Sequence, residues 1–229
     1  MEVLNSPDFW IGLLKIVWIN IILSGDNAVV IALAARSLPP AQQKKAVLIG
    51  SGAAVVLRIA LTVVAARLLA LPYLQILGGV LLLYIGFQLL SDEEDGEGES
   101  KEYGSMFAAV RTILIADLVM SLDNVIAVAA AAQGNNTLLI LGLAISIPLV
   151  IFGSTLMIRL MERFPIIVML GAALIGWVGG ETIAGDVALR GFAEANPWLH
   201  YVAAALGAAL VVLAGRWMQR RAHTATRAR

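Results

Sequence analysis

Four acidic side chains lie in stretches of the sequence that are otherwise strongly apolar: Asp26, Asp117, Asp123 and Glu181. A carboxylate near the centre of a membrane-spanning helix costs roughly 2.5 to 3.5 kcal/mol on insertion scales. Carboxylates at this depth face one another or a wet cavity, and they mark ion or proton pathways. The acids therefore indicate such a pathway, and the alternative is a set of hydrogen bonds that holds a helical bundle together.

The neighbours of these acids form two polar stripes. Side chains four and seven positions apart share one face of a helix. This spacing is present twice, as Asn20, Ser24 and Asn27 in one stretch and as Asp117, Ser121 and Asn124 in the other. Asp26 and Asp123 lie off these stripes in a regular helix, so each faces another neighbour or its helix breaks.

Turn-forming residues favour a break in the first of these stretches. Ser24-Gly25-Asp26-Asn27 combines residue types that are typical of turns. The second stretch has Leu122 in place of Gly25, which makes a break there less favoured. Unwound backbone at membrane depth is tolerated where it lines a cavity, and it offers carbonyl oxygens as ligands.

The donor set suits a hard divalent cation. Carboxylate, amide and hydroxyl oxygens are the ligands that Mg²⁺, Ca²⁺ and Mn²⁺ prefer. The chain has no cysteine and only two histidines, so a zinc, copper or nickel site is disfavoured. Protons are the natural counter-ion, since the same carboxylates can titrate when the metal leaves.

These considerations predict a metal site whose direct ligands are Asp26 and Asp123. Three further residues are expected to complete or tune the shell, namely Asn27, Asn124 and Asp117. The secondary candidates are Asn20, Ser24, Ser121, Glu181 and Arg58. Arg58 lies in another apolar segment, and it either pairs with a carboxylate between cargoes or forms a structural ion pair. No resident cofactor and no enzymatic activity are expected, because no nucleophile and base are suitably paired.

The composition requires a membrane around these residues. Hydrophobic residues make up 60% of the 229 residues and charged residues 14%, against roughly 45–50% and 25% in soluble domains. A soluble fold of this size cannot hide so much apolar surface. The net charge is zero, which leaves no field to steer an anionic partner. The composition excludes an ordinary soluble enzyme, a disordered chain and a nucleic-acid binder.

Seven apolar segments are long enough to cross a bilayer, which takes roughly 20 residues. They cover 9–35, 46–70, 72–90, 106–132, 137–161, 165–184 and 198–218. The apolar runs are too long for strands and do not alternate, so a membrane β-barrel is disfavoured. The expected fold class is all-α, a polytopic membrane bundle of about seven helices.

The segments repeat. Residues 19–35 match residues 115–131 without a gap, and residues 72–88 match residues 165–181. Because three helices is an odd number, the second copy enters the membrane from the opposite side, as in many secondary transporters. The predicted units are a first repeat (1–90), an acidic cytoplasmic loop (91–105), an inverted repeat (106–185), and a seventh helix with a basic tail (186–229).

The basic residues predict the orientation of the chain. Cytoplasmic loops are enriched in lysine and arginine. The loops after the first, third and fifth segments, together with the C-terminal tail, carry most of them. On the opposite side lie only Arg67 and Arg190. The N-terminus is therefore expected outside and the C-terminus in the cytoplasm.

The motifs SGDNAVVIALAARSLP (24–39) and ADLVMSLDNVIAVAAAA (116–132), with GWVGGE (176–181), resemble the TerC family of bacterial membrane proteins. The compact length resembles its YjbE-type branch, within the LysE-like transporter superfamily. The resemblance covers the first six helices. It implies an inner-membrane exporter of Mn²⁺, or of another hard divalent cation such as Ca²⁺, in exchange for protons. It also implies a cation site at the positions of Asp26, Asp117 and Asp123, with Asn27 and Asn124 beside them.

Two other functions fit the same sequence. One is export of amino acids or other small organic solutes, which the wider superfamily includes. The other is a non-transporting membrane protein that supports assembly or metal loading of partners through the acidic loop at 91–103. The sequence leaves the oligomeric state open, and it predicts the lipid bilayer, a divalent metal ion and protons as the partners.

Overall fold

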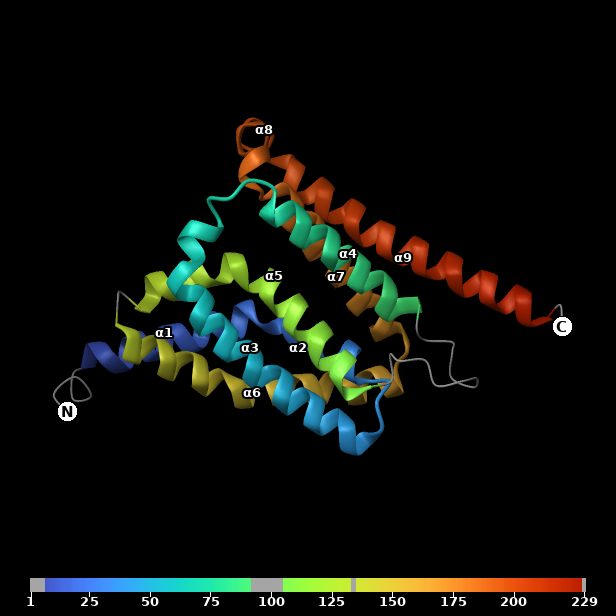
Figure 1. The fold of residues 1–229 in the computed structure, drawn as a ribbon, viewed down its shortest axis with the longest axis horizontal. Helices are drawn as coiled ribbons and strands as arrows, with labels where there is room; N and C mark the ends of the chain where they lie inside the picture. Colours follow the sequence, from blue (N-terminus) through green and yellow to red (C-terminus); the bar gives the residue numbers. More distant parts are fainter. Residues whose placement is uncertain (1–6, 92–104, 133–134, 228–229) are drawn as a thin grey trace.

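The computed structural model describes residues 7–91, 105–132 and 135–227 (Figure 1). Within these ranges the side chains at 7, 8, 63–67, 123, 136 and 219–227 are not described. Residues 92–104, most of the predicted acidic loop, lie outside the described residues. The described part consists of helices and their connections and contains no strand, which confirms the predicted polytopic helical bundle.

The helices follow one another with short connections where the chain is described. Their order is α1 (Pro7–Leu23), α2 (Gly25–Ala35), α3 (Pro40–Leu68), α4 (Leu74–Ser91), α5 (Met106–Ala132), α6 (Asn136–Arg163), α7 (Ile166–Ala184), the 3₁₀ helix η3 (Val187–Leu189), α8 (Arg190–Ala195) and α9 (Trp198–Arg227). The predicted segments match α3 to α7 and α9, and the first segment matches α1 and α2 together.

Five of these helices are long and apolar enough to cross a membrane, and the number rises to as many as seven if each of two bent pairs counts as one span. The first pair is Phe9–Leu23 with Gly25–Ala35, bent by 51°. The second is Met106–Leu122 with Asn124–Ala132, bent by 63° within α5. Both bends fall at the predicted Asp-Asn positions, so the polar motifs and the irregular backbone coincide.

The helices pack in two groups (Figure 1). Helices α4, α7 and α9 lie side by side and contact one another. In the other group α1 packs on α6, α3 packs on α5, and α1 also contacts α5. The short helix α2 contacts α5 and α6 as well as α7, so it lies between the two groups.

Glycine allows the helices of the first group to approach closely. A Cβ atom added to Gly176 would lie 2.5 Å from the carbonyl oxygen of Gly207, and one added to Gly180 would overlap the carbonyl oxygen of Ala203. Gly79 and Gly179 meet in the same way between α4 and α7. Small residues four apart are the usual means of close helix packing in membranes.

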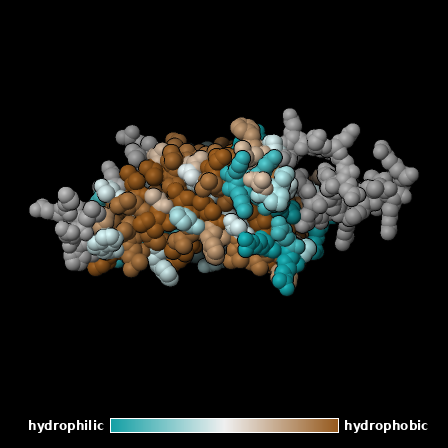
Figure 2. All heavy atoms as spheres, turned by 90° about the horizontal axis from the view of Figure 1, so that it is seen from below, coloured by the Kyte–Doolittle hydropathy of each residue, from teal (hydrophilic) through white to brown (hydrophobic). Residues whose placement is uncertain are grey.

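The outer surface is apolar. Large hydrophobic side chains point outward from most of the spanning helices, among them Leu14, Val56, Leu77, Phe152 and Leu213. Figure 2 shows hydrophobic residues over most of the described surface on this side, with hydrophilic residues gathered toward one end. Exposing so much apolar surface to water is unfavourable, whereas contact with lipid tails removes that cost.

One buried carboxylate connects the end of α7 to the start of α4. Asp186 follows α7 and accepts backbone N–H groups of Tyr73, Gln75 and Ile76 at the start of α4, at 2.9, 3.0 and 3.1 Å, and the N–H of Ala188 at 2.8 Å. Burial alone would raise the pKa of Asp186, but these four N–H groups hold that pKa below its ordinary value. Asp186 therefore caps α4 from across the chain.

Candidate cation site in the membrane

The predicted break within the first stripe is present. Ser24 separates α1 from α2 with φ −114° and ψ 7°, outside the helical region. The last carbonyl groups of α1 and the first N–H groups of α2 consequently lose their helical partners. One of these carbonyls, that of Leu23, accepts the side-chain amide of Asn124 at 3.0 Å. The break in the first copy is thus tied to the Asp-Asn motif of the second.

Asp26 and Asn27 open the first turn of α2. One carboxylate oxygen of Asp26 accepts the backbone N–H of Asn27 at 2.8 Å, and the side chain is partly buried. The side chain of Asn27 is only 3% exposed, and neither its amide nitrogen nor its oxygen has a hydrogen-bond partner within the described chain. A buried amide without partners costs about 1–3 kcal/mol, so this one stands out as a group that a ligand would satisfy.

Arg58 is the centre of a buried polar cluster between α1, α3 and α5. Its Nη2 atom forms an ion pair with Asp117 Oδ1 at 2.5 Å, and both side chains are 5% exposed. Its Nη1 atom donates to Asn20 Oδ1 at 2.8 Å and to Ser24 Oγ at 3.2 Å. Its Nε atom donates to Ser121 Oγ at 3.0 Å. One side chain from α3 therefore joins both predicted stripes.

Hydrogen bonds join the first two residues of each stripe, as expected for side chains four positions apart on a helix. The Ser24 hydroxyl donates to Asn20 Oδ1 at 3.0 Å, and the Ser121 hydroxyl donates to Asp117 Oδ2 at 3.1 Å. Asn20 also donates to the hydroxyl of Ser146 on α6. Sequence reasoning did not find Ser146, because an isolated serine in an apolar helix usually bonds its own backbone, and Ser146 does so as well, at Leu143.

The structure brings some of the predicted site residues together and leaves others apart. Asn20, Ser24, Arg58, Asp117 and Ser121 form the cluster. Asn124 lies at the break through its bond to α1. Glu181 is exposed in the last turn of α7, outside the helices that carry the cluster.

The direct pairing of Asp26 with Asp123 stays a prediction. The side chain of Asp123 lies outside the described residues. Among the side chains that are described, no group of three or more acids or histidines is close enough to hold a metal ion. Among the described residues, the ligands available to a cation at the break are Asp26, amide oxygens and freed backbone carbonyls, since Asp117 is engaged by Arg58.

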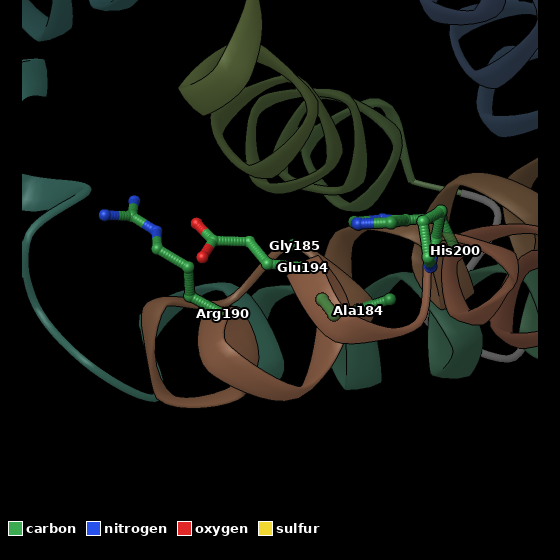
Figure 3. A pocket seen from close by; sticks show the side chains of 7 residues that line it. Ala184, Gly185, Arg190, Glu194 and His200 are labelled. Atoms are coloured by element: carbon green, nitrogen blue, oxygen red, sulfur yellow. The ribbon is translucent and has the colours of Figure 1, made fainter.

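A hollow lies outside the cluster, beside α8. It encloses about 340 Å³ and is lined by Ala184, Gly185, Arg190, Ala193, Glu194, Pro197 and His200. Figure 3 shows Arg190 and Glu194 on one side of this hollow and His200 on the other. It lies at the end of α7 and touches none of the cluster residues.

The fold and the cluster define a class, a polytopic helical membrane protein with a charged centre beside a broken helix. The chain belongs to the TerC family, since the model for the integral membrane protein TerC family matches residues 5–223. This confirms the resemblance seen in the Asp-Asn motifs.

Two relatives show how far the similarity extends. The chain is 44% identical over 212 residues to the uncharacterized membrane protein YjbE of Bacillus subtilis (strain 168), covering 93% of this chain and 97% of YjbE. It is 28% identical over 231 residues to the inner membrane protein YoaE of Escherichia coli (strain K12), covering 93% of this chain but only 43% of YoaE. No solved structure matches the chain.

Proposed function

We propose that this protein is a secondary transporter that exports a divalent cation, with Mn²⁺ as the first substrate to test, in exchange for protons. The observation that carries the proposal is the broken helix at Ser24. It leaves the carboxylate of Asp26 and the unpartnered amide of Asn27 side by side within an apolar bundle. A static membrane protein gains nothing from an unsatisfied buried amide next to a carboxylate.

Broken helices are suited to binding ions that must later leave. The C-terminal end of a half-helix carries partial negative charge and free carbonyl oxygens, which coordinate cations in transporters with discontinuous helices. The end of α1 supplies such carbonyls, and Asp26 lies in the first turn of α2, just after the break. These ligands are hard oxygen atoms, which favours Mn²⁺, Mg²⁺ or Ca²⁺ over softer metals.

Reciprocal helix packing supports alternating access. If helices α1 to α4 and α5 to α7 are inverted copies, α1 corresponds to α5, α3 to α6, and α4 to α7. The contact of α1 with α6 is then the counterpart of the contact of α3 with α5, and both are present. In our proposal the two copies rock about the site at the broken helices.

The proposed orientation places the N-terminus outside and the C-terminus in the cytoplasm. In this orientation the α2–α3 and α6–α7 connections face the cytoplasm, and the basic residues Arg36, Lys44 and Arg163 lie in or next to them. The cation would enter from that side. Protons returning from outside would neutralise the Asp26 carboxylate after the metal leaves.

The test is transport in proteoliposomes loaded with a dye that Mn²⁺ quenches. We expect Mn²⁺ entry that depends on a pH gradient and falls at least tenfold in Asp26→Asn, since a neutral amide is a far weaker ligand for a divalent cation. Glu162→Gln is the matched control, because it makes the same chemical change at an exposed side chain near the end of α6. Parallel runs with Ca²⁺ and Mg²⁺ identify the substrate.

Two results would overturn the proposal. Flux that is normal in Asp26→Asn would remove the site assignment. An absence of flux for every metal, in protein shown to be folded, would favour export of an organic solute or a non-transporting role. Competition with amino acids and deletion of residues 91–103 then separate those two functions.

A further inference from the structure

A fixed positive charge within a site proposed for cations requires an explanation. The Arg58 side chain is 4% exposed and reaches from α3 to acceptors on both α1 and α5. The guanidinium group of arginine is a permanent positive charge in proteins. Its charge can therefore leave the cluster only if the side chain itself moves.

The contacts of Arg58 also distinguish the two carboxylates of this region, Asp117 and Asp26. Both oxygens of Asp117 are engaged, one by Arg58 and the other by the Ser121 hydroxyl. Asp26, by contrast, accepts only backbone N–H groups among the described contacts, those of Asn27 and of its own residue. The two carboxylates of the cluster region therefore differ: Asp117 is paired with Arg58, and Asp26 has no side-chain partner among the described contacts.

We propose that Arg58 is a tethered competitor of the transported cation, which neutralises Asp117 and fills the α5 side of the cluster until an entering cation displaces it. This inference rests on the proposed function. It makes Arg58 a specificity-determining residue. Only an ion that interacts with the Asp117 carboxylate more favourably than the guanidinium does can take its place. A divalent cation meets this requirement better than a monovalent one, since its attraction to a carboxylate is twice as large.

The geometry permits such a displacement. The acceptors of Arg58 are short side chains on two different helices, and three of the four are neutral, namely Asn20, Ser24 and Ser121. Asp117 is the only charged group among them. Without the guanidinium, the hydroxyls of Ser24 and Ser121 still have acceptors within their own stripes, Asn20 and Asp117. The stripes therefore remain hydrogen-bonded when Arg58 departs.

The experiment measures equilibrium Mn²⁺ binding to the purified full-length protein, using the loss of the electron paramagnetic resonance signal of free Mn²⁺. We expect Arg58→Gln to bind Mn²⁺ about tenfold or more tightly than the unmodified protein, because juxtaposed like charges cost several kcal/mol and 1.4 kcal/mol is tenfold. Arg58→Lys keeps the charge and is expected to stay within about threefold of the unmodified protein. Arg111→Gln, an exposed arginine on α5, is the matched control.

A purely structural role for Arg58 predicts a different pattern. Lysine cannot reach all four acceptors, so Arg58→Lys would then resemble Arg58→Gln, and both would bind Mn²⁺ with unchanged or weaker affinity. That result would overturn the proposal. If Arg58→Gln does not fold, Asp117→Asn is compared with the double variant Arg58→Gln/Asp117→Asn, which removes the unpaired charge. The double variant must bind Mn²⁺ more tightly, and equal binding would overturn the proposal.

Failure of this inference is distinguishable from failure of the proposed function. Binding that depends on Asp26 but does not tighten when Arg58 is removed contradicts the competitor alone. An absence of Asp26-dependent Mn²⁺ binding in every folded variant contradicts both.

Discussion

The two groups of helices differ in how closely their backbones pack and in whether their buried polar groups are hydrogen-bonded. In α4, α7 and α9, glycine backbones touch, and the buried Asp186 accepts four backbone N–H groups. Around α1, α2 and α5, a helix is broken and the buried amide of Asn27 has no partner in the described chain. Unsatisfied groups reduce stability, and proteins retain them where function needs them. The comparison indicates one group that serves as a frame and another that carries the site.

The largest effect is expected from disrupting the frame with Gly180→Leu. Any side chain there overlaps the carbonyl oxygen of Ala203, a backbone atom that cannot move aside without moving α9. Overpacking costs about 1–3 kcal/mol where side chains can adjust, and more where they cannot. We expect little folded protein by size-exclusion chromatography. Gly52→Leu is the control, since nothing lies within 4 Å of its added Cβ; equal yields of the two variants would contradict the prediction.

A smaller loss of stability is expected from Asp186→Asn. The amide nitrogen of asparagine is a donor and would face backbone N–H groups that need an acceptor. We expect the free energy of unfolding to fall by about 1–3 kcal/mol, measured as a shift of the melting temperature in detergent. Glu194→Gln, an exposed acid on α8, should leave the melting temperature unchanged.

The same carboxylate predicts a pH dependence. The pKa of Asp186 is lowered in the folded state, so its stabilising contribution is complete above the unfolded pKa of about 3.9. It is lost as the pH falls through the lower folded pKa. The difference in melting temperature between the unmodified protein and Asp186→Asn should therefore shrink below about pH 4. A difference that stays constant down to the acid limit of folding would contradict this.

The sequence predicted the frame and the site to different extents. The spans and the break at Ser24 follow from local signals, namely apolar length and turn-forming residues. The stripes follow from helical spacing. The partner of Arg58 does not, because α3 and α5 meet only through tertiary packing, and the pair with Asp117 fits both interpretations of Arg58. The role of Asp186 was missed for the same reason, since three of its four N–H donors lie more than 100 residues earlier.

Asn27→Leu tests whether the buried amide at the site lowers stability while it contributes to Mn²⁺ binding. Leucine has the same number and branching of side-chain heavy atoms as asparagine and no polar atoms, so it removes two buried groups that have no partner in the described chain. We expect the free energy of unfolding to rise by about 1 kcal/mol while Mn²⁺ binding weakens at least tenfold. The two measurements are melting temperature and metal titration of the same preparation. If binding is retained, Asn27 is not a ligand, and its unsatisfied amide has no role in the proposed transport.

The smallest effect is expected from Ser51→Ala on α3. The Ser51 hydroxyl is also buried without a partner in the described chain, but it lies seven residues before Arg58 rather than at the break. If the site is confined to the cluster and the break, the substitution should raise the free energy of unfolding by about 1 kcal/mol or less and leave Mn²⁺ flux unchanged. Residues seven apart share a helix face. A fall in flux would therefore extend the pathway two turns along α3, toward the proposed cytoplasmic end, and would make part of that helix a conduit for the cation.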